Sequence, residues 1–149
     1  MIYILIITLI FAGDYLLKNR IEKNEKEGDT RKILGGAFLV RKHHNRGFVL
    51  NKGSHNQTLV AAISLGMAVI CTILFVVSLT GKGSALLHTG LAILLGGAYS
   101  NTYDRLRRKY VVDYFSFNVP VKGIRRVIFN ISDMCIIIGA LVSAIAAER

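Results

Sequence analysis

Apolar residues fill four long stretches of the chain, and charged residues gather between them. The second and third stretches hold no charged residue and the fourth holds only Asp133, so these three have the composition of segments that cross a bilayer. The first stretch is shorter and carries Asp14 near its end. Inside lipid, a helix pairs its backbone N–H and C=O groups within one segment. We therefore predict membrane-spanning helices over about residues 1–17, 59–79, 83–101 and 127–147.

The intervening segments, 18–58 and 102–126, are predicted to lie outside the bilayer. In the first of them, short bursts of β-prone residues alternate with glycine-containing turns, which is typical of a small antiparallel sheet. These bursts are Ile33-Leu34, Phe38-Leu39-Val40 and Phe48-Val49-Leu50. In the second segment, the alternation over Tyr110–Phe117 predicts a strand or extended stretch that brings Asp113 to one face.

The predicted fold is one integral membrane domain over residues 1–149. Its class is an all-α membrane protein with four transmembrane helices and a small extramembrane antiparallel β-sheet. The last helix is predicted to begin near Phe129, with Asn130 or Ser132 as its N-cap. Small residues on the third helix are predicted to let helix backbones approach closely. These residues are Gly90, Gly96, Gly97, Ala98 and Ser100.

Composition agrees with a membrane protein and also suggests a partner. Hydrophobic residues make up 52% of the chain, and the net charge is +10. That charge is concentrated in Lys18–Lys52, with net +6, and Asp104–Arg126, with net +5. Because these basic segments flank membrane spans, anionic lipid headgroups are the expected counter-charge, and nucleic acid is a poor partner. We predict no cofactor, since His43, His44 and His55 lack a metal-ligand spacing.

Carboxylates at the edge of a membrane are costly and therefore suggest function. Asp14 and Lys18 are four residues apart on one helix, which permits an ion pair and favours a supporting role. Asp104 neighbours Arg105 and could simply hold the loop. Asp113 and Asp133 have no basic residue beside them. If the fold brings these two together, desolvation and repulsion would raise the pKa of one, so that one activates a water and the other protonates a leaving group.

The chain also resembles a known family through motifs that occur in the same order. The matching residues are Asp14…Lys18, Asn45-Arg46-Gly47-Phe48, Gly96–Arg105, Val111-Val112-Asp113-Tyr114 and Phe129–Asp133. By these motifs the chain resembles lipoprotein signal peptidase (signal peptidase II). The resemblance covers nearly the whole sequence. It implies a four-helix membrane protein with a β-cradle in the bacterial plasma membrane, and we expect a monomer.

The resemblance implies an aspartic endopeptidase that removes the signal peptide from diacylglyceryl-modified prolipoproteins, without a metal or a covalent intermediate. It implies that Asp113 and Asp133 are the catalytic dyad. Residues matching those that line the substrate site or support the dyad are Asn45, Asn101, Asp104, Arg105, Asn130, Asp14 and Lys18. The chain departs from the family pattern at Ser100, where the family has glycine, and at Ser132, where it has alanine. These departures bear on substrate shape more than on the chemistry.

Two alternatives stay open from the sequence. One is a divergent paralogue with the same dyad that acts on another membrane substrate or faces the opposite side. The positive-inside rule would place the two basic segments in the cytoplasm, whereas the resemblance places them on the outer face; long loops follow that rule weakly. The other alternative is a non-catalytic membrane protein that binds lipid or a partner helix.

Overall fold

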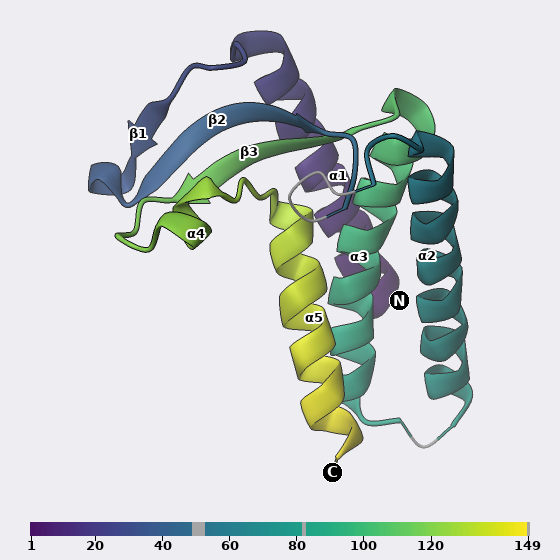
Figure 1. Cartoon of the computed structure of the whole chain (residues 1–149). Coiled ribbons are helices and arrows are strands. Elements are labelled where there is room, and N and C mark those ends of the chain that lie inside the picture. The colour runs from purple at the N-terminus through teal and green to yellow at the C-terminus, as the bar shows by residue number, and fades with distance from the viewer. Residues whose placement is uncertain (49–52, 82, 149) are drawn as a thin grey trace.

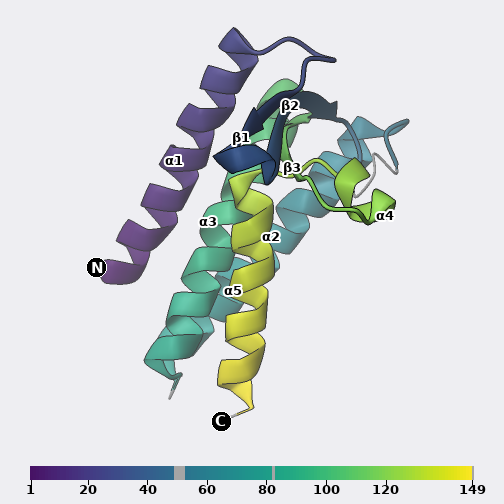
Figure 2. The ribbon, with the colours of Figure 1, turned by 90° about the vertical axis from the view of Figure 1, so that its left-hand side faces the viewer.

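A central helix organises the structure, which is a computed structural model describing residues 1–48, 53–81 and 83–148. Helix α3 (Ala85–Arg108) packs against each of the other long helices. These are α1 (Ile2–Asn24), α2 (Gln57–Thr80) and α5 (Ile131–Ala147). A small sheet lies across the end of the bundle where α2 begins and α3 ends (Figure 1). The view in Figure 2 shows α1 on the other side of α3 from α2.

The four long helices differ in how apolar they are, and α3 is set apart by its buried polar residues. Helices α1 and α2 are long and apolar enough to cross a membrane, and α5 is a shorter apolar helix. In contrast, α3 carries ten buried residues that include Ser100, Asn101 and Asp104. The predicted class is therefore confirmed in its coarse form, a mostly helical protein with a small antiparallel sheet and apolar helices.

The helices do not coincide with the membrane spans predicted to end at residues 17 and 101 and to begin at residue 127. The first helix continues to Asn24 and the third to Arg108. Their charged residues did not end them, because Lys18 and Asp104 are buried and paired inside the fold. The last helix begins only at Ile131, since Phe129 is extended and exchanges backbone hydrogen bonds with Phe115.

The sheet combines two distant segments of the chain. Strands β1 (Arg31–Ile33), β2 (Phe38–Asn45) and β3 (Val111–Phe117) are antiparallel, in the order β1-β2-β3. A short 3-10 turn, Leu34–Gly36, joins the first two strands with Gly35 and Gly36 at positive φ. The third strand is thus the segment expected to carry Asp113. Of the burst expected at 48–50, Phe48 lies outside any strand and the other two lie outside the described residues.

Two apolar clusters fix the sheet and the helices. Ile21 at the end of α1 packs with Val40, Val112 and Tyr114, so the sheet rests on α1. Phe75 of α2 packs with Leu91, Ala92 and Leu95 of α3, and Tyr3 of α1 packs against that cluster. A short helix, α4 (Lys122–Arg126), follows β3 and lies beside the sheet near the start of α5 (Figure 1).

Close approach of α3 to its neighbours depends on glycine, as predicted from the small residues of this helix. A methyl group at Gly97 would overlap the carbonyl of Ser132 in α5. One at Gly96 would lie 2.8 Å from the Ile10 side chain of α1. The contact at Gly97 brings the first turn of α5 directly against α3, so that Asn101, one turn further along, reaches Asp133.

Candidate active site

Asn130 joins the two aspartates that the sequence singled out. Its side-chain Nδ2 donates to Asp113 Oδ1 at 2.7 Å, and its backbone N–H donates to Asp133 Oδ2 at 3.1 Å. Asp113 comes from the middle of β3 and Asp133 from the first turn of α5. Asn130 is the N-cap of that helix, and its Oδ1 accepts from the Asp133 backbone N–H at 2.8 Å. The N-cap residue Asn130 therefore contacts both carboxylates, Asp133 through the capping box and Asp113 through its free amide N–H.

Three asparagines present amide donors to this pair, and their orientation is fixed by partners that can only donate. Asn130 Oδ1 is held by a backbone N–H, as just described. Asn45 Oδ1 accepts from the Gly47 backbone N–H at 3.1 Å, so its Nδ2 faces Asp113 Oδ2 at 3.1 Å. Asn101 Oδ1 accepts from the Lys18 ammonium at 2.8 Å, so its Nδ2 faces Asp133 Oδ1 at 2.8 Å. All four carboxylate oxygens of the pair therefore accept a hydrogen bond.

Neutral dipoles, rather than a paired cation, surround Asp113. Its side chain is buried, and within the described residues it forms no ion pair. Burial and the charge of Asp133 raise the pKa of Asp113 to about 7, while hydrogen bonds from Asn45 and Asn130 act in the opposite direction. A buried carboxyl beside a second carboxyl is the arrangement that keeps one proton on the pair near neutral pH.

A cleft of about 580 Å³ opens in front of the two carboxylates. Its polar end holds Asn45, Asn101, Arg105, Asp113 and Asp133. Its walls are apolar side chains from α2, α3, α5, the loop after β2 and the segment that leads into α5. They include Phe48, Ile63, Met67, Leu94, Phe129, Ile136 and Ala140. The cleft thus has a reactive end at the sheet and an apolar body that extends between the helices.

Arg105 is the cation at the polar end of the cleft. Its Nη2 donates to the Gly47 carbonyl at 3.2 Å, which ties α3 to the loop after β2. Its Nε is buried and has no hydrogen-bond partner among the described residues. A buried donor left unpaired is costly unless a ligand takes it. Arg105 therefore has a free donor close to the carboxylate pair.

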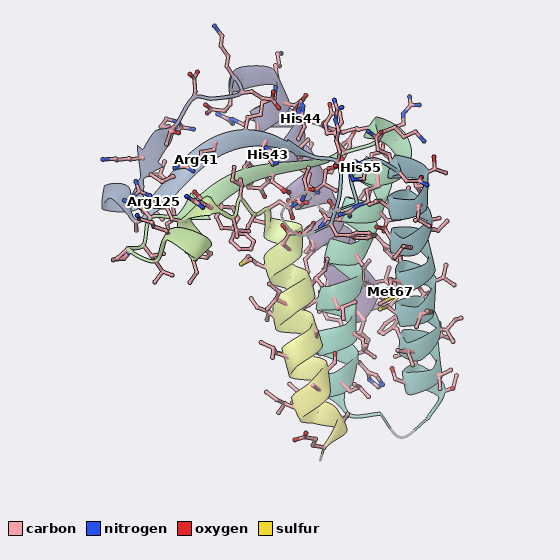
Figure 3. All side chains as sticks on the ribbon, in the orientation of Figure 1. Arg41, His43, His44, His55, Met67 and Arg125 are labelled. Carbon is pink, nitrogen blue, oxygen red and sulfur yellow. The ribbon has the colours of Figure 1, made fainter. Side chains whose placement is uncertain are left out.

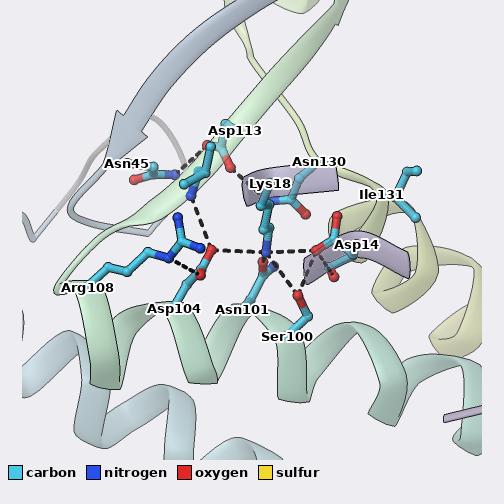
Figure 4. A network of polar contacts seen from close by, with 12 residues as sticks. Asp14, Lys18, Asn45, Ser100, Asn101, Asp104, Arg108, Asp113, Asn130 and Ile131 are labelled. Carbon is cyan, nitrogen blue, oxygen red and sulfur yellow. Dashed lines mark hydrogen bonds and ion pairs between the residues drawn. The ribbon is translucent and has the colours of Figure 1, made fainter. Parts of the chain in front are cut away.

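The remaining predicted residues form a second polar cluster behind the pair, outside the cleft lining. Lys18 is fully buried and lies 2.7 Å from Asp14 Oδ2 and 3.2 Å from Asp104 Oδ2 (Figure 4). Asp104 also pairs with Arg108 at 3.0 Å and accepts from the Val112 backbone N–H at 3.3 Å. The spacing of Asp14 and Lys18 predicted their pair. The sequence suggested that Asp104 could pair with its neighbour Arg105. Its partners are instead Lys18 and Arg108.

Three hydroxyls that the sequence analysis did not select also belong to this second cluster. Ser100 Oγ donates to Asp14 Oδ2 at 2.7 Å, Ser132 Oγ donates to the same oxygen at 2.5 Å, and Tyr114 Oη donates to Asp14 Oδ1 at 2.8 Å. Ser100 and Ser132 are the departures from the family pattern, and the structure places both hydroxyls on Asp14 rather than in the cleft lining. Each of the three is adjacent in sequence to a residue of the cleft, which is the signal that could have found them.

His43 and His44 lie along the sheet in β2, and His55 lies just before α2 (Figure 3). His44 contacts Glu22 at 2.9 Å and Glu27 at 3.2 Å, which ties β2 to the end of α1. Burial lowers the pKa of the His43 imidazole. His55 is exposed just before α2. Within the described ranges, no three His, Cys, Asp or Glu side chains are grouped so as to hold a metal ion.

Helices apolar enough for a membrane, with two joined carboxylates in a cleft at one end, define a membrane hydrolase of the aspartic type. The pattern of the family described as "Signal peptidase (SPase) II" matches residues 6–148. The chain is 34% identical over 140 residues to lipoprotein signal peptidase of Lactobacillus johnsonii, covering 94% of this chain and 87% of that protein. It is 32% identical to the Bacillus subtilis lipoprotein signal peptidase, covering 95% and 89%. The chain belongs to the signal peptidase II family.

The fold is also similar to that of a solved protein. A bacterial membrane enzyme determined by the in meso method at 2.3 Å resolution superposes with a TM-score of 0.83 and 24% sequence identity, covering 98% of this chain and 87% of that one. A second such enzyme, determined at 1.9 Å resolution, gives a TM-score of 0.79. The overall fold therefore agrees with that of solved bacterial membrane enzymes.

Proposed function

We propose that this chain removes signal peptides from lipid-modified prolipoproteins, with Asp113 and Asp133 as the catalytic dyad. The observation that carries the proposal is the single residue Asn130, which donates to both carboxylates at the polar end of an apolar cleft. The raised pKa of Asp113, about 7, supports a pair that holds one proton at neutral pH. That state supplies an acid and a base together.

The two carboxylates would act in succession on one water. Ionised Asp133 takes a proton from the water while the water oxygen attacks the scissile carbonyl carbon. Protonated Asp113 then gives its proton to the leaving amide nitrogen, the C–N bond breaks, and the new carboxyl and amine separate. The dyad ends with one proton, now on Asp133, so a proton shift between the two carboxyls restores the starting state. The free Nε donor of Arg105 would stabilise the oxyanion of the tetrahedral intermediate.

The cleft suits a substrate that is apolar on one side and cut at a peptide bond. Its apolar body would take the signal segment and the acyl chains, and its polar end would take the backbone at the cleavage position. Asn45 and Asn101 would support the dyad, since their amide groups each donate to one of its carboxylates. Asp14, Lys18 and Asp104 would support the site from behind. A single chain supplies all these side chains, so we propose that the enzyme works as a monomer.

The apolar helices and the sheet at one end of the bundle support a placement in the membrane. We propose a multi-pass protein of the bacterial plasma membrane, with α1, α2, α3 and α5 spanning it and the sheet on the outer face. Exposed Lys122, Arg125 and Arg126 on α4, together with Arg107 and Lys109 at the end of α3, would meet anionic headgroups. Exposed Val121 and Ile124 beside them would enter the interface. A reporter fused after Arg149 should then report the cytoplasm.

The decisive experiment is cleavage of a diacylglyceryl-modified preprotein by the purified chain in lipid. The wild type should release the signal peptide, whereas Asp113→Asn and Asp133→Asn should each lose at least about a thousandfold in rate, because each lacks one proton-transfer group. Asp29→Asn, an exposed carboxylate in the loop after α1, is the matched control and should cut normally. A wild type that leaves the substrate intact would instead favour a binding protein or a paralogue with another substrate.

A further inference from the structure

Tyr114 links the element that carries one aspartate of the dyad to the element that carries the other. It follows Asp113 in β3, and its side chain is 4% exposed. Its hydroxyl group accepts a hydrogen bond from the Ile131 backbone N–H at 2.9 Å and donates one to Asp14 Oδ1 at 2.8 Å. Ile131 opens α5, two residues before Asp133. One phenol group therefore connects β3, the start of α5 and α1.

Asp14 gathers further hydroxyls from the same neighbourhood. Ser132, which precedes Asp133, and Ser100, which precedes Asn101, both donate to its Oδ2. The Lys18 ammonium lies on that oxygen as well, so the carboxylate is fixed on α1 by its own helix. Asp14, Lys18, Ser100 and Ser132 are each at most 2% exposed. Each hydroxyl thus holds a residue adjacent to the dyad, or to its amide donor, on one buried anchor.

We propose that Tyr114 is a positioning residue for the dyad, acting through its hydroxyl on Asp14 and on the first turn of α5, with Ser132 and Ser100 as its partners on the same carboxylate. This inference rests on the proposed function of Asp113 and Asp133. The separation of the two carboxylates depends on how β3 sits against the start of α5. Since Asn130 contacts both carboxylates from the same turn, a displaced turn would change both contacts together.

The chemistry of the phenol suits this role. Burial and the charge of Asp14 raise the pKa of Tyr114, so the hydroxyl keeps its proton and remains a donor. Its loss would leave both the Ile131 N–H and one oxygen of Asp14 without this partner in a buried place, which favours a shift of the turn. Displacements of about 1 Å at a reacting pair can cost up to about a hundredfold in rate.

The test compares Tyr114→Phe with Tyr99→Phe in the lipidated-preprotein assay. Tyr99 is a matched control, because its hydroxyl also bonds a partner on another helix, Thr72 at 2.7 Å, and lies outside the dyad cleft. Both variants should melt a few degrees below the wild type. Tyr114→Phe alone should lower kcat about tenfold, leave KM within about twofold, and move the pH at which kcat declines. Ser132→Ala should lower kcat about threefold to tenfold.

The outcomes separate the two proposals. A wild type that fails to cleave overturns the proposed function and this inference with it. A wild type that cleaves, beside folded Tyr114→Phe and Ser132→Ala proteins with unchanged kcat and pH profile, overturns the inference alone. Equal losses of kcat in Tyr114→Phe and Tyr99→Phe would also overturn it, since they would reduce Tyr114 to a general packing role. If Tyr114→Phe does not fold, the kcat of Ser132→Ala decides.

Discussion

This protein has two neighbouring pairs of carboxylates, and the pairs differ in whether a cation contacts them. Asp14 and Asp104 share the ammonium of Lys18, and Arg108 binds Asp104 as well. Asp113 and Asp133 receive only amide and backbone N–H donors, and among the described residues neither is in an ion pair. A cation at contact distance strongly favours the ionised form of a carboxylate, whereas N–H donors favour it less, so that burial and mutual repulsion can keep one proton on the second pair.

This difference in partners indicates different roles for the two pairs. The pair around Lys18 is a structural anchor, because its charges are matched in place. The dyad faces a cleft and has no paired cation, and burial with the charge of Asp133 raises the pKa of Asp113 to about 7. Asn101 connects the two pairs, since it accepts from Lys18 and donates to Asp133. The cation therefore influences the dyad through an amide rather than by neutralising it.

The largest expected effect comes from removing the shared cation. Lys18→Met should destabilise the fold by about 3–5 kcal/mol, because it leaves two buried carboxylates without their common partner. Thermal melting in detergent measures this loss. Lys23→Met, at an exposed position in the same helix, should change stability by less than about 0.5 kcal/mol. Equal melting temperatures for the two variants would contradict an anchor at Lys18.

A smaller effect, dependent on pH, is expected at the dyad. Because the pKa of Asp113 is raised to about 7, the folded state holds this proton more tightly than the unfolded state. The wild type should lose stability as pH rises from about 4 to about 7, with the full loss present above 7. Relative to the wild type, Asp113→Asn should therefore gain about 2–3 kcal/mol between pH 5 and pH 8.

Denaturation measured at several pH values checks this gain in stability, with the exposed Asp29→Asn as the control variant. A difference between Asp113→Asn and the wild type that stays constant from pH 5 to pH 8 would mean that Asp113 titrates at its ordinary value.

The link between the two pairs predicts an intermediate change in rate. Asn101→Leu removes the donor to Asp133 Oδ1 while keeping the volume, and should lower kcat about tenfold. Lys18→Met in the Asn101→Leu background should lower kcat by less than Lys18→Met alone, since the contact of Lys18 with Asp133 through Asn101 is then already cut and its ion pairs with Asp14 and Asp104 remain. Steady-state kinetics of the two single variants and the double variant measure the coupling. Additive losses would mean that Lys18 does not act on the dyad through Asn101.

The smallest effect is expected for an exposed ion pair of similar chemistry. Arg31 and Glu25 lie 2.8 Å apart, but the Arg31 side chain is 61% exposed. Arg31→Gln should change stability by less than about 0.5 kcal/mol, because water and salt screen such pairs. Melting beside Lys18→Met makes the contrast direct. A loss as large as that of Lys18→Met would show that burial does not set the difference.

The sequence predicted the parts of this arrangement that depend on local pattern. Long apolar runs identified the helices, the Asp14–Lys18 spacing predicted their pair, and Asn130 was one of two expected N-caps. The resemblance of the motifs identified the family, which the comparisons confirm. Catalytic roles for Asp113 and Asp133 stay predictions, although the fold brings both to one cleft.

What the sequence missed depends on contacts between distant segments. Pairing of β2 with β3 joins residues about 70 positions apart, and no local pattern specifies it. The sequence predicted the pairing of Lys18 with Asp14 but not its burial, which Asp104, 86 positions away, makes possible. From the sequence, Ser100 and Ser132 were expected to affect the shape of the substrate site. Only the folded chain shows that both hydroxyls contact Asp14 instead.

The most direct test of the contrast between the two pairs is a titration of the Asp113 carboxyl, by 13C NMR of labelled aspartate in the folded protein. We predict an aspartate with a pKa near 7 whose signal is absent in Asp113→Asn. In Asp133→Asn the same carboxyl should titrate at lower pH, because the repulsion is gone while burial remains. A pKa near 4 for Asp113 in the wild type, unchanged in Asp133→Asn, would contradict a shared proton at this site.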